Sequence, residues 1–305
     1  KVVEEMFLQK GEVFDFDLTI PEELSFEGQQ GKTELLALLK VIKTIGQNDF
    51  FGEGVLNLND QEIEEIADLL TDSKIIRHNL GAILASLLES NSAEFGVQLV
   101  IPNELDFNNK TESKAEIEAL LNALNVIKEE DFLTGGTLGL SNEEVADLLT
   151  NSIIIRHNLR ALLETLLADS SNEFDVPLII PSELDFNDKT ESKDEVEALL
   201  NALNAIKDND FLAGGVDNLS DEAIDDFVDD VTASIIIASN LNEMIEKILT
   251  DSLPEDEKLN KSIEVLGEMD FNTEDGKNEL RFLLKGLGAA KSLSDYAYEN
   301  IGFHI

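Results

Sequence analysis

Apolar residues recur along this chain with a spacing that is typical of amphipathic helices. Ile117, Leu120, Leu121, Leu124 and Ile127 follow one another in steps of one or three residues, which places them on one helical face. The same spacing recurs at Leu35, Leu38, Leu39, Ile42 and Ile45, and at Val196, Leu199, Leu200, Leu203 and Ile206. We therefore predict three long helices that each bury one face.

An alternating pattern precedes helices of this kind. Apolar side chains occupy every second position at Phe95, Val97, Leu99 and Ile101, and again in residues 174–180. A period of two with β-branched residues is typical of a strand, and the proline that follows would end the strand. We therefore expect one short β-strand before each long helix.

Serine and glutamate residues mark the expected helix starts. In a capping box, a serine and a glutamate three residues later bond the free amides of the first turn. Three pairs have this spacing: Ser113 with Glu116, Ser192 with Glu195, and Ser141 with Glu144. The first two pairs predict the starts of long helices, and the third predicts the start of a second, shorter helix.

A third helix is expected after the second. The segments SKIIRHNL, SIIIRHNL and SIIIASNL begin at Ser73, Ser152 and Ser234, which are candidate N-caps. Glycine-containing loops, FFGEG, FLTGG and FLAGG, separate the first and second helices. Each unit is therefore predicted to hold one strand and three helices.

These elements belong to an internal repeat. IPEELSF at Ile20 returns as IPNELDF at Ile101, as IPSELDF at Ile180, and as LGEMDF ending at Phe271, a period of about 80 residues. The predicted division is 1–11 as the end of a preceding repeat, 12–92 as repeat 1, 93–171 as repeat 2, 172–252 as repeat 3 and 253–305 as a partial repeat 4. The predicted fold is mainly α, with each repeat a three-helix bundle preceded by one short strand, and the repeats form an elongated rod.

The two ends do not coincide with repeat boundaries. KVVEEMF at residues 1–7 is similar to the end of a third helix, and GKNELRFLLKGLG from Gly276 parallels the first helix GKTELLALLKVIK from Gly31. We expect the chain to be a segment of a longer array.

The charge narrows the range of partners. The chain of 305 residues carries 22 basic and 64 acidic residues, a formal net charge of −42. So negative a surface repels phosphate backbones and anionic lipid, so we expect no nucleic-acid partner and no membrane insertion in this segment. Without cysteine, disulfides, thiolate metal sites and cysteine nucleophiles are excluded.

The organisation resembles the stalk regions of large bacterial cell-surface proteins, of the adhesin, surface-layer or filament type. The IPxELxF turns and the repeated S(K/I)IIRHNL segments carry this resemblance. It implies a structural or adhesive segment at the bacterial cell surface, outside the cell, that acts as a spacer, tether or filament subunit. The partners it implies are neighbouring repeats, identical rods, another surface protein or a glycan.

The histidine positions are weak candidates for chemistry. His78 and His157 occupy the same place in the RHN motif, whereas repeat 3 has Ser239 there. A metal site would need converging ligands, and no HxxxH or HExxH pattern occurs. We therefore interpret these histidines and the adjacent arginines as surface or inter-repeat contacts.

We expect no cofactor, but the acidic segments make calcium binding the possibility to consider. The segment from Asp106 has Lys110 and Thr111 where an EF-hand needs an oxygen ligand and a glycine. A denser cluster supplies the candidate metal ligands Asp217, Asp221, Asp225 and Asp229. Spacing of four residues among the last three is equally typical of a solvated helix face.

No sequence pattern indicates an enzyme. GxSxG, P-loop and GxGxxG motifs are missing from the sequence. A catalytic cleft usually gathers residues of different types, whereas this chain repeats the same residues in several repeats. Two alternatives to a structural role stay open: a peptide- or glycan-binding repeat module, and a divalent-cation-responsive element.

Overall fold

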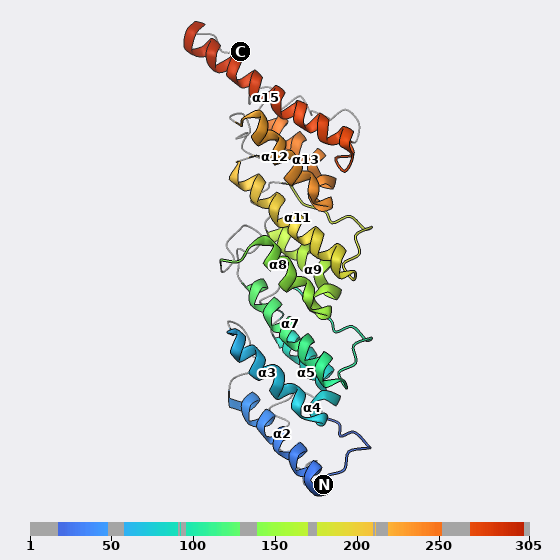
Figure 1. The fold of residues 1–305 in the computed structure, drawn as a ribbon. Coiled ribbons are helices and arrows are strands. Elements are labelled where there is room, and N and C mark those ends of the chain that lie inside the picture. The colour runs from blue at the N-terminus through green and yellow to red at the C-terminus, as the bar shows by residue number, and fades with distance from the viewer. Residues whose placement is uncertain are drawn as a thin grey trace. The chain divides into compact units, whose positions relative to one another are not determined.

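The computed structural model describes nine stretches of the chain. These are residues 18–47, 58–90, 92, 96–128, 139–169, 176–209, 211, 219–251 and 269–301. The helices are α2 (Gly28–Gln47), α3 (Asp60–Asp72), α4 (Lys74–His78), α5 (Leu80–Ser90), α7 (Lys110–Lys128), α8 (Asn142–Asn151), α9 (Ile153–Asp169), α11 (Lys189–Asp208), α12 (Asp221–Ala233), α13 (Ile235–Asp251) and α15 (Glu274–Ile301). Figure 1 shows these helices in chain order.

The chain divides into two compact units. Unit 1 comprises Lys1–Glu130, Asp147–Leu162 and Phe186–Lys189, and unit 2 comprises Asp131–Ala146, Leu163–Asp185 and Thr190–Ile305. In unit 1, α3 contacts α2, α4 and α7; in unit 2, α12 contacts α13 and α15. The rod shape expected from the repeats is a statement about the whole chain and stays a prediction.

Helices follow one another in a recurring order. Repeat 2 supplies α7, α8 and α9, repeat 3 supplies α11, α12 and α13, and α15 is the first helix of the partial repeat 4. In repeat 1 the third helix is divided at Asn79 into α4 and α5. The expectation of a mainly helical chain is confirmed.

The predicted β-strands are wrong for the residues that the structure describes. Residues 97–101 and 177–180 contain no strand, and Phe95 and Phe174 lie outside the described residues. The alternation has another cause: Leu99 is buried while Val100 is 55% exposed, so one side of an extended segment packs and the other does not. One-sided burial produces a period of two without any strand ladder.

The two capping boxes predicted at the long helices are also wrong. α7 begins at Lys110, so Ser113 lies inside its first turn, where its hydroxyl donates to the carbonyl oxygen of Phe107 at 2.8 Å. Glu116 turns away to a different helix, as described below. Ser192 and Glu195 hold the matching positions in α11 and are likewise buried.

Other local predictions hold. The amide of Ser141 donates to Glu144 and the amide of Glu144 donates to Ser141, which is a capping box at the start of α8. The hydroxyl of Ser141 also donates to the Glu144 carboxylate at 3.0 Å. The bond from the Ser141 backbone, and then the bond from its side chain, hold the pKa of Glu144 below its usual range. The expected helix end in residues 1–7, the loops FFGEG and FLTGG, and residues 212–215 of FLAGG lie outside the described residues.

Candidate functional site

A buried glutamate in each full repeat joins the first helix to the start of the third. In repeat 2, the hydroxyl of Ser152 donates to Oε1 of Glu116 at 2.7 Å. The amides of Ile153 and Ile154 donate to the two carboxylate oxygens, each at 3.0 Å. The hydroxyl of Ser152 then accepts from the amide of Ile155 at 3.2 Å. Three free amides at this helix start are thus bonded by two side chains.

The same arrangement recurs with nearly the same distances in the other two full repeats. Glu34 and Glu195 take the place of Glu116, and Ser73 and Ser234 take the place of Ser152. Their contacts are Ser73–Glu34 at 2.7 Å, Lys74–Glu34 and Ile75–Glu34 at 3.0 Å, Ser234–Glu195 at 2.8 Å, Ile235–Glu195 at 2.9 Å and Ile236–Glu195 at 3.0 Å. We call this contact the glutamate cap.

A buried carboxylate without a basic partner is normally costly. Here the cost is offset because the carboxylate faces the N-terminus of a helix, where amide donors and the helix dipole favour negative charge. Burial raises the pKa of Glu195, and the bonds from Ile236, Ile235 and Ser234 lower it by less. The glutamate cap therefore fixes the third helix against the first at a defined place.

An asparagine in each third helix bonds the extended segment that was predicted as a strand. The Asn158 side chain accepts from the Val100 amide at 2.8 Å and donates to the Val100 carbonyl at 2.7 Å. It also donates to the carbonyl of Ile154 at 2.7 Å. The equivalent pairs are Asn79 with Thr19 and Asn240 with Ile179. One amide side chain thus satisfies both backbone groups that a neighbouring strand would have paired.

Phenylalanines of the IPxELxF turns pack against the preceding repeat. The ring of Phe107 comes within 3.7 Å of the place where a side chain at Gly81 in α5 would begin. In the next repeat the ring of Phe186 lies under the guanidinium of Arg160, 5.7 Å from its centre. Both rings are buried. These contacts belong to unit 1 and link a repeat to the one before it.

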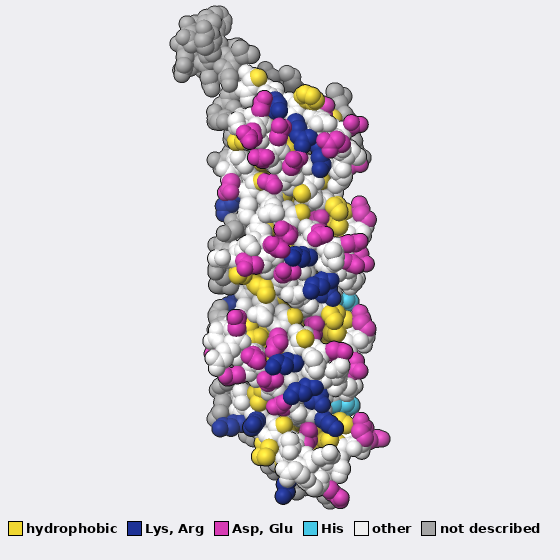
Figure 2. Space-filling model, viewed as in Figure 1, with side chains coloured by type: hydrophobic (Ala, Val, Ile, Leu, Met, Phe, Trp, Pro, Cys, Tyr) yellow, Lys and Arg dark blue, Asp and Glu magenta, His cyan; other side chains and the backbone are white. Residues whose placement is uncertain are grey.

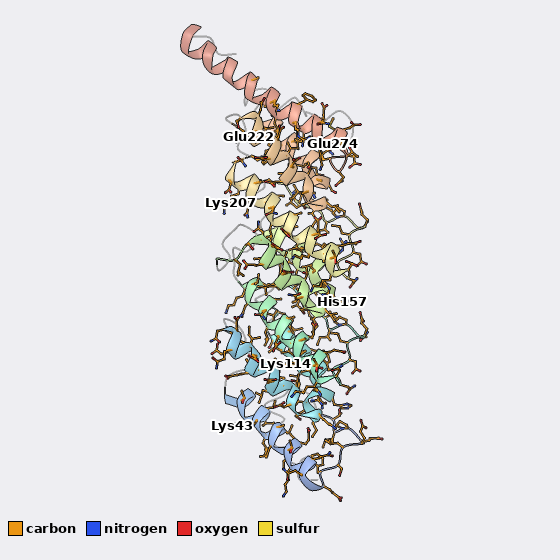
Figure 3. The ribbon with its side chains drawn as sticks, viewed as in Figure 1. Lys43, Lys114, His157, Lys207, Glu222 and Glu274 are labelled. Carbon is orange, nitrogen blue, oxygen red and sulfur yellow. The ribbon has the colours of Figure 1, made fainter. Side chains whose placement is uncertain are left out.

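Ion pairs join the second helix of one repeat to the first helix of the next. Figure 3 shows Lys114 on α7 beside α3; its ammonium lies 2.8 Å from Asp68 and 3.6 Å from Glu64. The hydrogen bond to Asp68 is the largest influence that raises the pKa of Lys114. Lys193 lies 3.2 Å from Glu143 in the same way in unit 2. Figure 2 shows basic side chains set among acidic ones along the visible face.

Three of the four candidate metal ligands lie on α12, the second helix of repeat 3, at the spacing that the sequence indicates. Asp217 lies outside the described residues, and Asp221 is in the exposed first turn of α12. Asp225 lies 3.5 Å from both Arg281 and Lys285 of α15, and Asp229 is paired with Arg281. Among the described residues, no group of three His, Asp or Glu side chains is arranged to hold a metal ion. Two of these carboxylates thus form ion pairs with basic side chains of α15.

In the RHN motif the histidine is exposed, whereas the arginine forms hydrogen bonds within its repeat. His78 and His157, the latter labelled in Figure 3, are exposed. Arg77 and Arg156 donate to the carbonyls of Thr71 and Thr150 near the ends of α3 and α8. The arginines therefore bond helix ends within their own repeats.

Unit 2 also contains a cavity of about 380 Å³ between α8, α11 and α12. Amides and carboxylates line most of it, including Asn142, Asn204 and Asp230. Burial, followed by the charges of Asp226 and Asp229, raises the pKa of Asp230. Among the described residues that line it, the aromatic side chain is Phe227, which is buried.

Sequence reasoning missed the glutamate cap and the asparagine contact. A signal was present: glutamate keeps its place in GKTEL, SKAEI, SKDEV and GKNEL, and asparagine stays in the third helix of repeat 3 where the arginine and histidine are replaced. A polar residue kept among changing neighbours indicates a specific bond.

No protein family, curated protein or solved structure matches this chain. No helix in the described part is long and apolar enough to cross a membrane.

Proposed function

We propose that the chain is a structural or adhesive repeat segment of a bacterial surface protein, outside the cell, that serves as a spacer, tether or filament subunit. The observation that supports this proposal lies in unit 1, where α7 contacts α3 of the preceding repeat and its Glu116 bonds the start of α9 in its own repeat. Contacts between sequence neighbours are what holds repeat proteins together.

A role without catalysis belongs to the same proposal. The polar side chains buried in each repeat, such as Glu116, Ser152 and Asn158, bond backbone amides and carbonyls of the chain itself. Their recurrence in three repeats favours a role in holding each repeat folded over a role in a reaction centre. The partners proposed are neighbouring repeats and other surface components.

Stretching the single chain between its two ends tests the proposal. A load-bearing spacer of linked repeats is expected to unfold in discrete steps, and a full repeat of about 80 residues would release about 280 Å of extended chain. The repeats are expected to refold when the force is relaxed. Extension without any cooperative step would contradict a load-bearing role.

The variant Glu116→Ala provides a matched comparison in the same experiment. It removes the glutamate cap of repeat 2 alone, so one step should move to lower force while the steps of repeats 1 and 3 stay in place. A uniform loss of all steps would show that the repeats do not bear load individually.

A further inference from the structure

The first helix of the partial repeat 4, α15, has the sequence features of the other first helices. GKNEL at residues 276–280 matches GKTEL at residues 31–35. Both glycines are buried and approach the preceding turn closely: an added Cβ would lie 2.2 Å from the backbone of Phe26 at Gly31 and of Asp270 at Gly276. Glu279 therefore stands at the position of Glu34, Glu116 and Glu195.

Glu279 nevertheless differs from these three residues in its surroundings. The three cap glutamates are buried, whereas Glu279 is exposed. Further along the same side of α15, Leu283 is half-buried and Gly286 is exposed, and a side chain at Gly286 would meet nothing within 4 Å. We call Glu279, Leu283 and Gly286 the open face of α15.

The other side of α15 is covered. Leu280 and Leu284 are buried, and α15 contacts α12. Arg281 and Lys285 pair with Asp225 and Asp229 on this side. The helix is thus docked on repeat 3 by one face, while the face that bears Glu279 has no helix against it among the described residues.

The full repeats show what covers this face. At the equivalent places in α7, the carboxylate of Glu116 bonds the start of α9, and Leu120 and Ala123 are buried. In α11, Glu195 bonds the start of α13, and Leu199 and Ala202 are buried. The occupant is in each case a helix that begins with serine followed by isoleucines.

We infer that the open face of α15 is a docking site for the second and third helices of a further repeat of this kind, with Glu279 bonding the N-terminus of the third helix. The inference deepens the proposed function, because it names the partner at one end of the repeat series. The two ligand features that it requires are a serine N-cap and two free amides after it.

The test supplies helices of this kind as a separate peptide. A fluorescent peptide with the sequence of residues 141–169, which spans α8 and α9, is titrated with the full chain and followed by anisotropy. We expect saturable binding, with an affinity reduced by the cost of folding the peptide. No saturable binding up to about millimolar chain would overturn the inference, since a dissociation constant above about 1 mM corresponds to a negligible specific contact.

Matched variants locate the site. Glu279→Gln in the chain and Ser152→Ala in the peptide should each weaken binding, the first by roughly 10- to 100-fold because a bond to a charged group is lost. Asp275→Asn removes one charge from the exposed first turn of α15 and should leave binding unchanged. Leu39→Ser on α2 should also leave it unchanged.

Equal binding by the Glu279→Gln and Asp275→Asn chains would overturn the inference, as would loss of binding on Leu39→Ser, which would place the peptide on α2. These variants are on exposed positions, and circular dichroism of each chain checks that the fold is kept. Failure of peptide binding leaves the stretching result untouched, so the docking site and the load-bearing role are judged separately.

Discussion

The four first helices fall into two classes. α7 and α11 bury two faces, whereas α2 and α15 bury one each, and not the same one. α2 buries Glu34, Leu38 and Val41 and leaves Leu39 38% exposed, and α15 buries Leu280 and Leu284 and exposes Glu279. The face of α2 that is buried is the face of α15 that is open.

This difference distinguishes two contacts that α7 and α11 make at the same time. One face, marked by the cap glutamate, is made for the second and third helices of the same repeat. The other, marked by the equivalents of Leu35 and Leu39, is made for the preceding repeat. Phe26 is exposed, whereas its equivalents Phe107 and Phe186 are buried against the preceding repeat, as expected for a side chain that belongs to the second face.

Removal of the cap glutamate should have the largest effect in an interior helix. Glu116→Ala leaves the Ser152 hydroxyl and two amides without a partner in a buried place, and we expect a loss of roughly 3 to 6 kcal/mol in local stability. Glu279→Ala should change stability by less than about 0.5 kcal/mol. Hydrogen exchange at the amides of Ile153 and Ile154 measures the first effect.

The same experiment can show whether the interior helix α7 and the end helix α15 really differ. Equal losses in Glu116→Ala and Glu279→Ala would show that Glu279 is already engaged. Slow exchange at Ile153 in the Glu116→Ala chain would show that water or another group replaces the carboxylate without cost.

The second face is tested by leucines at equivalent positions. Leu121→Ala should cost about 2 to 5 kcal/mol because this side chain is fully buried on α7, the helix that contacts α3 of the preceding repeat. Leu39→Ala, which truncates the half-covered equivalent in α2, should cost no more than about 1 kcal/mol. Urea unfolding of both variants, followed by circular dichroism, gives the two values. Similar costs would mean that the outer face of α2 is covered in solution.

A third prediction concerns a contact that lies inside one repeat and so should not depend on neighbours. Asn158→Ala and Asn79→Ala should each cost about 2 kcal/mol, because each leaves a backbone amide and a carbonyl without a partner. His157→Ala, an exposed neighbour of Asn158, serves as the control and should change stability by less than about 0.5 kcal/mol. A much smaller cost in repeat 1 than in repeat 2 would show that neighbours do strengthen this contact.

The helices could be predicted from the sequence, but the contacts between residues far apart in the chain could not. Local signals worked, because the spacing of Ile117 to Ile127 and the serines at helix starts act within a few residues. The partner of Glu116 lies 36 residues away at Ser152, and nothing in local spacing indicates it. Local spacing therefore pairs Glu116 with Ser113, three residues earlier, although its partner is in another helix.

The predicted strand is wrong for a related reason. Alternation at Leu99 and Ile101 reports only that one side of the segment is buried, and both a sheet and a single extended segment meet that condition. What decides between them is the partner of the Val100 backbone, and this partner is the side chain of Asn158 in a distant helix. The repeated asparagine, more than the alternation, carried that information.

Acidification should distinguish the buried Glu195 from the exposed Glu279 through their effects on stability. Burial raises the pKa of Glu195, and burial with nearby Asp226 and Asp229 raises that of Asp230, so these two groups bind protons more readily in the folded chain than in the unfolded chain. Their contribution to stability should therefore rise as the pH falls from 7 toward the range of these raised pKa values. Glu195→Gln should flatten the rise in melting temperature, whereas Glu279→Gln, with the same change in charge, should not. Equal slopes in both variants would assign the effect to net charge alone.

The smallest expected effect is a difference between cations. A net charge of −42 makes the chain repel itself, and salt relieves this repulsion beyond a Debye length of about 8 Å at physiological ionic strength. Because Arg281 and Lys285 occupy the carboxylates of Asp225 and Asp229, we expect screening and no calcium site. Na⁺, Mg²⁺ and Ca²⁺ at equal ionic strength should raise the melting temperature alike, and Asp225→Asn with Asp229→Asn should behave as Glu64→Gln with Asp68→Asn does beside Lys114. A saturable rise with micromolar Ca²⁺ alone, removed only by the first pair of changes, would instead make α12 a calcium-responsive element, since a carboxylate site prefers the larger ion with its more flexible oxygen shell.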